Sequence, residues 1–413
     1  MTMTLSGGPA GVQTLQQRAR QIALATGIDT RLIALMSIMA VVWVALDAAT
    51  GGVFLSARNL FNLSVQFAVV GIMATGMVLV IVTRNIDISV GSLLGFIGVC
   101  GALLQVRSLG LDDPNAWWIT TVAMVAGGVL LGLINGLVVA YLRVPALIVT
   151  LAGLMFYRNA AYQVTEGVTI APLDETFQII GGGLNGTIGE TWSWIVGAAA
   201  VAAIAWGTLA TRRRRRKYGF PLRHPAMEAA MIAFWSLVVL VFVNTMNNYN
   251  KPNTEEPMGI AVPVLILFGV AATMSFIAKR TRFGRYIYAI GGNPDSAELV
   301  GIDTRKVVVS TFTLMGFLAG LAAVVVTARL NAATNATGIM TELQVIAAAV
   351  VGGTSLAGGL GTIFGAVLGA LFIQSLESGM VLLRLDSPVQ KMVIAVVLVS
   401  AVVIDMAFRR KRS

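Results

Sequence analysis

Long apolar runs, separated by short polar stretches, fill almost the whole chain. Their lengths are close to the ~20 helical residues that cross the hydrocarbon core of a bilayer. Backbone amide groups find no water in lipid, so each spanning segment must be a helix. The pattern predicts an all-α fold, a polytopic transmembrane helical bundle with spans at 32–50, 65–83, 88–106, 117–141, 146–158, 192–210, 226–243, 260–278, 306–328, 343–357, 360–383 and 389–407, about 12 in all.

Two of these spans, 146–158 and 343–357, are short for a full crossing. At about 1.5 Å per residue, the shorter one extends only about 20 Å. The hydrocarbon core is roughly 30 Å thick. Each is therefore a half-helix or continues through its flanking polar residues. The glycines at 361, 365 and 369 are spaced four residues apart, which allows close contact between helices in a membrane.

The composition supports a membrane protein, since apolar residues make up 57% of the chain and charged residues 12%. A soluble domain carries about 25% charged residues. The net charge of +10 could indicate nucleic acid, but the basic residues cluster between apolar runs, at 212–217, 279–285 and 409–412. That placement is typical of cytoplasmic loops. A nucleic-acid binder would spread such charge over a soluble face.

The basic clusters also predict the topology. With the N-terminus inside, alternating crossings put all three clusters on the cytoplasmic side and the loops 159–191, 244–259 and 329–342 outside. An odd number of spans would separate the clusters. We therefore expect an even number, with the N- and C-termini cytoplasmic. The chain is predicted to consist of a cytoplasmic N-terminal arm at 1–30, a transmembrane domain at 31–408 and a basic cytoplasmic tail at 409–413. The transmembrane domain includes a cytoplasmic loop at 279–306.

The N-terminal segment, the one cysteine and the one histidine offer no candidate catalytic or metal site. Residues 1–30 lack the apolar core and cleavage site of a signal peptide, so the first span is expected to act as the uncleaved insertion signal. Residues 15–24 form either an amphipathic surface helix or a disordered tail. Cys100 has no partner for a disulfide, and His224, the one histidine, is expected to be a solvated loop residue. No metal site is predicted.

A polar break at 83–92 separates the second and third spans. Its Asp87 and Ser89 suit the N-terminus of the following helix. Two interpretations stay open: a capped cytoplasmic turn, or a discontinuity that lines a pathway, as broken helices do in transporters.

Inside the spans, neutral polar side chains outnumber charged ones. Gln66, Asn135, Gln344 and Gln374 suit weak hydrogen bonding to an uncharged sugar or polyol, or hydrogen bonds between helices. Ionisable groups are few, with Glu377 lying within a span, and this argues against ion coupling. The candidates for a translocation pathway are Asn85, Asp87, Ser89, Asn135 and Gln344.

The loop 279–306 carries a helix of its own. Pro294 suits a helix start and Gly301 a helix end. The apolar residues Ala297, Leu299, Val300 and Ile302 then need a partner, and a cytoplasmic protein is the natural one. The glycine-rich stretch 352–361 lacks the Gly-Lys-Ser/Thr signature of a phosphate loop. We interpret it as a tight turn, and we expect no ATP hydrolysis by this chain alone.

Several segments resemble the permease subunit of bacterial monosaccharide ABC importers, a ribose/xylose permease family. They are RFGRYIYAIGGNP at 282–294, AELVGI at 297–302, AVVGGTSLAGG at 349–359, IDISVGS at 86–92 and VPALIVTLAG at 144–153. The similarity covers most of 53–408. FLSARN at 54–59 and the insertion at 192–243 are most similar to xylose-type members. The resemblance implies a 10-span family core plus an inserted pair of spans.

The resemblance also implies partners: a second permease copy in a homodimer, a cytoplasmic ATPase subunit with two nucleotide-binding halves, and a periplasmic sugar-binding protein. ATP-Mg would be held by the ATPase subunit, and no cofactor by this chain. The chain would be a multi-pass protein of the bacterial inner membrane that imports a monosaccharide, xylose or a related sugar, by alternating access. The residues implied in ATPase coupling are Arg282, Phe283, Gly284, Arg285, Gly292, Asn293, Ala297, Glu298, Gly301 and Ile302.

Two other classes remain. A self-contained, ion-coupled secondary sugar transporter would also have twelve helices and a basic loop in the middle. The few intramembrane carboxylates and the helix-bearing 279–306 loop count against it. A non-transporting membrane scaffold is opposed by the family motifs.

Overall fold

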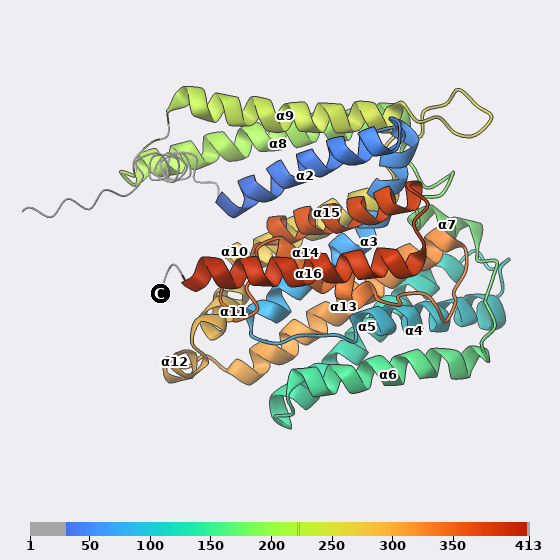
Figure 1. Ribbon diagram of the computed structural model, residues 1–413. Coiled ribbons are helices and arrows are strands. Elements are labelled where there is room, and N and C mark those ends of the chain that lie inside the picture. Colours follow the sequence, from blue (N-terminus) through green and yellow to red (C-terminus); the bar gives the residue numbers. More distant parts are fainter. Residues whose placement is uncertain (1–29, 221, 223, 411–413) are drawn as a thin grey trace, which may run out of the picture.

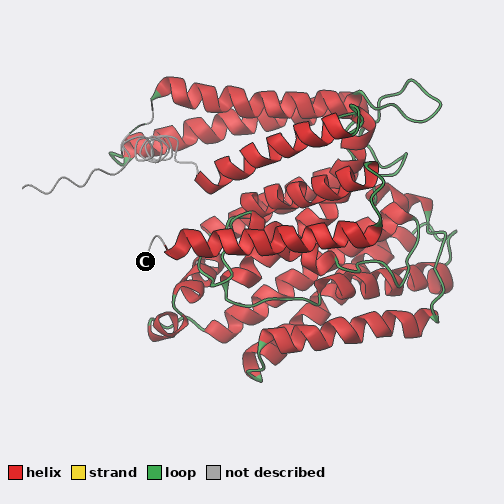
Figure 2. Cartoon of the chain, viewed as in Figure 1, coloured by secondary structure: helices red, strands yellow, loops and turns green. Residues whose placement is uncertain are grey.

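A computed structural model of the chain describes residues 30–220, 222 and 224–410. Helices joined by turns and loops make up this part, and no strand occurs in it (Figures 1 and 2). The predicted N-terminal arm, apart from Thr30, and residues 411–413 of the predicted tail lie outside the described residues. The all-α class is confirmed. The elements are α2 (Thr30–Ala49), α3 (Ala57–Val82), α4 (Val90–Leu103), η1 (Leu104–Leu109), α5 (Ala116–Tyr141), α6 (Ala146–Thr165), α7 (Glu175–Ile180), α8 (Gly189–Lys217), α9 (Pro225–Asn247), α10 (Val262–Arg280), α11 (Arg282–Gly292), α12 (Pro294–Leu299), α13 (Thr304–Leu330), α14 (Thr341–Val351), α15 (Ile363–Leu382) and α16 (Ser387–Arg410).

A helix stands at each of the predicted spans. Among the described residues, nine helices are long and apolar enough to cross a membrane: α2, α3, α4 with η1, α5, α8, α9, α10, α13 and α15. The fifth predicted span is α6, which continues past its predicted end to Thr165 and reaches 20 residues. The tenth is α14, which has 11 residues and so extends only about 16 Å, the length of a half-helix. The even total and the cytoplasmic termini stay predictions.

Helix α3 is the centre of the bundle because its sequence is apolar on all sides. Every residue from Phe67 to Val82 is buried. Helices α10, α13, α14 and α15 pack around it. By contrast, α2, α8 and α9 lie together along one flank of the bundle (Figure 1) and bury few side chains.

Glycines allow two helix pairs to pack backbone against backbone. A Cβ atom on Gly128 or Gly132 of α5 would overlap the backbone of α13 around Gly316. In the same way, Gly365 and Gly369 of α15 face the backbone of α14. The contact between α15 and α14 confirms the close approach expected from the glycine spacing at 361–369. The contact between α5 and α13 is a second close approach through glycines, at positions that were not predicted.

The basic segments gather at one end of the bundle. The C-terminal ends of α8, α10 and α16 and the whole of α11 and α12 lie at the left of Figure 1, whereas α7 and the 248–261 loop lie at the right. This grouping agrees with the side on which the charge pattern placed them.

Candidate coupling surface and interior polar chain

The connection between α10 and α13 is a series of short helices whose starts are capped by side chains. Thr281, Asn293 and Asp303 each accept a hydrogen bond from the backbone N–H three residues later, at 3.1, 3.0 and 3.1 Å. Pro294 opens α12, and Gly301, at φ +85°, stops it with a left-handed residue. The predicted helix after Asn293 is therefore present. Helix α11 is a separate, preceding helix that the sequence analysis had not distinguished.

The apolar residues of α12 divide between two faces. Ala297 is 4% exposed and packs on the bundle, so it anchors the helix. Leu299 and Val300 are 88% and 77% exposed. No residue that the structure describes buries these two large apolar side chains at the tip of a short helix, and such exposure is typical of an interaction surface.

The coupling candidates fall into the same two groups. Gly284 and Ala297 are buried and hold the segment on the bundle, while Phe283 and Ile302 are half-buried. The remaining candidates are exposed and available to a partner: Arg282, Arg285, Gly292, Asn293, Glu298 and Gly301. Leu299 and Val300, which lie in the 297–302 motif but are not among the coupling candidates, belong beside them.

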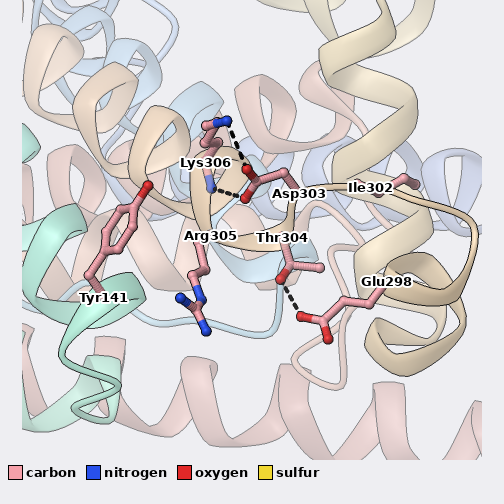
Figure 3. Close-up of a pocket in the computed structure, with 7 residues that line it drawn as sticks. All are labelled: Tyr141, Glu298, Ile302, Asp303, Thr304, Arg305 and Lys306. Atoms are coloured by element: carbon pink, nitrogen blue, oxygen red, sulfur yellow. Dashed lines mark hydrogen bonds and ion pairs between the residues drawn. The ribbon is translucent and has the colours of Figure 1, made fainter.

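A shallow cavity of about 400 Å³ opens beside α12. Its lining residues are Tyr141, Glu298, Ile302, Asp303, Thr304, Arg305 and Lys306 (Figure 3). The Thr304 hydroxyl donates to Glu298 Oε1 at 2.5 Å, and Lys306 Nζ lies 3.0 Å from Asp303 Oδ2. The hydrogen bond from the Lys306 backbone N–H, followed by that from its side chain, lowers the pKa of Asp303 below its usual range. The cap is therefore ionised at neutral pH, which favours the start of α13.

A chain of four hydrogen-bonded side chains lies inside the bundle. The Ser89 hydroxyl donates to Asp87 Oδ1 at 2.6 Å, Asn135 Nδ2 donates to Ser89 Oγ at 3.3 Å, and the Tyr157 hydroxyl donates to Asn135 Oδ1 at 3.1 Å. All four residues are at most 4% exposed. We call Asp87, Ser89, Asn135 and Tyr157 the interior polar chain. It joins α5 and α6 to the non-helical segment before α4 and brings together three of the five predicted pathway residues.

The break between α3 and α4 is more than a solvated turn. Residues 85–89 are non-helical; Asp87 is 2% exposed and Ser89 fully buried. The Ile86 carbonyl accepts a hydrogen bond from Thr150 of α6 at 3.3 Å. Irregular backbone within a membrane protein is tolerated where it is buried in protein or lines a cavity. Burial therefore argues against a solvated turn, and the pathway-lining interpretation stays a prediction.

The other two pathway candidates lie elsewhere. Asn85 Nδ2 bonds the carbonyl and hydroxyl oxygens of Thr83, both at 3.1 Å, and so closes the turn after α3. Gln344 Nε2 donates to Glu377 Oε2 at 3.0 Å, beside a cavity of about 210 Å³ between α14, α15 and α16. Gln374 donates to the same carboxylate oxygen at 2.6 Å.

The interior holds more charge than the sequence indicated. Arg158 of α6 donates from Nη1 to the carbonyl oxygens of Asn335 and Thr337, both at 2.9 Å. Glu342 at the start of α14 is 7% exposed. Arg158 ends the predicted span 146–158, whose helix continues to Thr165, and Glu342 lies just before the predicted span 343–357. A search of span termini, as well as span centres, would have found both.

Arg84 joins the non-helical segment to α11. Its Nε and Nη2 atoms donate to the carbonyl oxygens of Gly291 and Gly292 at 3.0 and 2.7 Å. The backbone N–H of Gly359 donates to the Val82 carbonyl at 3.0 Å. The predicted glycine-rich turn is thus present, and it packs against both α3 and α11. Burial also raises the pKa of Tyr288, whose hydroxyl donates to the Gly361 carbonyl at 2.7 Å.

These features define a multi-pass membrane protein with a polar interior and an exposed helical surface at one end. Residues 59–402 match the family described as branched-chain amino acid transport system / permease component. The chain belongs to this permease family, whose members in bacteria lie in the inner membrane.

Sugar permeases are among its relatives. The xylose transport system permease protein XylH of Haemophilus influenzae is 37% identical over 90% of this chain and 95% of its own length. The protein of the same name from Escherichia coli K12 is 37% identical over 88% of each chain. The ribose import permease protein RbsC of that strain is 33% identical over 85% of this chain and 87% of its own length. No solved structure matches. The resemblance to xylose-type permeases is confirmed.

Proposed function

We propose that this chain is the membrane-spanning permease of an ATP-driven importer of xylose or a related monosaccharide. The observation that carries the proposal is the 37% identity to a xylose permease over nine-tenths of the chain. Similarity of that extent is not confined to one segment of the chain.

The energy would enter at α12. A cytoplasmic ATPase subunit with two nucleotide-binding halves would hold ATP-Mg and bury Leu299 and Val300. The side-chain caps at the starts of α11, α12 and α13 would help the segment to move as a unit. Arg84 then links α11 to the non-helical segment 85–89, and through it to Asp87 and Ser89.

The sugar would pass an interior lined by weak hydrogen-bonding groups. Neutral amides and hydroxyls, such as Asn135 and Ser89, can exchange their partners for sugar hydroxyls without the cost of moving a charge. A periplasmic sugar-binding protein would deliver the sugar, and a second copy of this chain would complete the pathway as a homodimer. Alternating access follows if ATP binding and hydrolysis move the two copies relative to each other.

The buried carboxylate of Glu342 and the half-buried one of Glu377 give one reason to test a second function, ion-coupled secondary transport. The chain should be reconstituted in liposomes with and without its candidate ATPase and binding protein. Uptake of labelled xylose is then measured with ATP on the ATPase-bearing side. We expect uptake only when all three proteins and ATP are present.

Two comparisons make this experiment decisive. Uptake by the chain alone on a proton or sodium gradient would overturn the proposal in favour of secondary transport. Ribose and xylose offered together would establish the substrate, because the relatives include both xylose and ribose permeases. Preference for ribose would keep the ATP-driven mechanism and reject xylose.

A further inference from the structure

The α8–α9 hairpin is fastened to the bundle mainly at one end. The side chains of α8 and α9 that are buried at that end are Ser193, Gly197, Val243, Met246 and Asn247. There, the hydroxyl of Ser193 accepts a hydrogen bond from Ile260 N at 2.9 Å. Toward the other end, the one buried residue is Glu228, and the hairpin meets the bundle there through an edge contact of Trp235 with Phe364. Most of its circumference is covered by no described residue and is therefore open to lipid.

Helix α8 is longer than a bilayer core is thick. Its 29 residues extend about 43 Å, against roughly 30 Å of hydrocarbon. Trp192 is 64% exposed near one end and Tyr218 is 64% exposed at the other. Such aromatic residues mark the two membrane–water interfaces. The last turns of α8 therefore lie at the level of the lipid headgroups.

Those last turns form a basic collar, which we define as Arg213, Arg214, Arg216 and Lys217. All four are exposed. None of them makes an ion pair with a residue that the structure describes. The nearby acid is already used, because Arg212 Nη1 lies 2.6 Å from Glu228 Oε2. The collar is left with four positive charges on successive faces of one helix.

We propose that the basic collar binds the phosphate-bearing headgroups of anionic phospholipids, such as phosphatidylglycerol. Each headgroup carries a negative charge and acceptor oxygens, which arginine guanidinium groups bind with two parallel hydrogen bonds. The collar lies at headgroup depth on a helix surrounded by lipid, so this ligand is present at high local concentration. The hairpin thereby gains a second anchor at the end where the bundle holds it weakly. This inference does not depend on which sugar is transported.

Trp206 provides a local probe. It is 69% exposed and lies seven residues before Arg213, about 10 Å along the helix. The full-length protein is placed in vesicles that contain phosphatidylcholine and increasing fractions of phosphatidylglycerol. One of the two lipids carries brominated acyl chains, which quench tryptophan fluorescence on contact. Subtracting the signal of the Trp206→Phe protein isolates the quenching of Trp206.

We expect the quenching to report a preference for phosphatidylglycerol, and the preference should fall as salt rises. One basic residue near an anionic surface contributes about 1 kcal/mol, a fivefold change in affinity. Glutamine at all four collar positions should therefore reduce the preference by about fivefold or more. The matched control R213K/R214K/R216K keeps the charge and should retain most of the preference.

Several outcomes would overturn the proposal. They are a wild-type protein without lipid preference, a glutamine variant that keeps it, and a lysine variant that loses it as fully as the glutamine variant. Competition by millimolar inorganic phosphate would reassign the collar to soluble anions. If the glutamine variant lost ATPase binding in lipid-free detergent but kept its lipid preference in vesicles, the collar would be reassigned to protein docking. The salt dependence of the wild-type protein keeps the test valid even if the glutamine variant inserts poorly.

Discussion

The Arg84 guanidinium donates a hydrogen bond to the Gly291 carbonyl at 3.0 Å and so ties the end of the central helix to the end of α11. The two residues are 207 positions apart in the sequence. Since Arg84 is followed directly by the segment that carries Asp87 and Ser89, this contact connects the exposed α11–α12 helices with the interior polar chain. Four predictions test that connection and its two ends.

Replacement of Arg84 by glycine should uncouple the two ends. Arg84 has φ +65°, which glycine adopts freely, so the variant removes the side chain without straining the backbone. Hydrogen bonds from a charged donor contribute about 1.5–3 kcal/mol. We expect ATP-driven uptake to fall about tenfold while the ATPase still binds, since α12 is unchanged.

Arg384→Gly is the matched control for this variant. Arg384 is also an arginine at positive φ, 58°, and is exposed at the end of α15. Its replacement should leave uptake near the wild-type rate. Equal losses from both substitutions would show that the Arg84 contact has no special role.

The neighbouring glycines of α11 should respond differently to alanine. A Cβ on Gly291 would overlap the Val82 carbonyl oxygen and the Gly359 backbone, whereas one on Gly292 meets nothing within 4 Å. Overpacking against backbone costs about 1–3 kcal/mol. Gly291→Ala should therefore lower the melting temperature in detergent and reduce uptake, and Gly292→Ala should leave the melting temperature unchanged. A tolerant Gly291 would mean that α11 can shift away without consequence.

Tyr157→Phe tests the interior polar chain. The substitution removes the donor to Asn135 Oδ1 but keeps the ring stacked on Phe96 at 6.1 Å between centroids. An unmade buried hydrogen bond costs about 1 kcal/mol, so a lower melting temperature is expected, together with slower uptake. Tyr162→Phe, on the exposed side of the same helix, is the control and should behave as wild type. Unchanged uptake in Tyr157→Phe would remove this chain of side chains from the pathway.

Leu299→Asp tests the docking surface. The side chain is almost fully exposed, so the folded chain tolerates the charge, but a partner that buries it would have to desolvate a carboxylate. Co-purification of the ATPase should fall at least tenfold, with the melting temperature unchanged. Leu184→Asp places the same change on a 56% exposed leucine at the opposite end of the bundle. It should not affect co-purification, and a comparable loss there would argue against docking through α12.

The membrane environment and the local structure of the chain follow from features that can be read in the sequence alone. The length of the apolar runs required helices in lipid. Their positions were predicted correctly, since α6 and α14 stand where the short spans were expected, and the caps at Asn293 and Gly301 act through neighbouring residues and could be predicted from them. The family resemblance indicates a cytoplasmic ATPase subunit as the partner of the α11–α12 segment.

Which polar residues meet depends instead on how the helices pack against one another. Asp87, Ser89 and Asn135 were chosen as separate candidates, and nothing in their spacing predicted that Tyr157 of another helix completes their hydrogen-bonded chain. Gln344 and Asn85 were chosen on the same grounds but lie elsewhere. The physical reason is that helix packing depends on glycine contacts such as Gly132 with Gly316, and these juxtapose residues that are distant in sequence. The contact between Arg84 and Gly291 arises in the same way, from the packing of α11 against the end of α3.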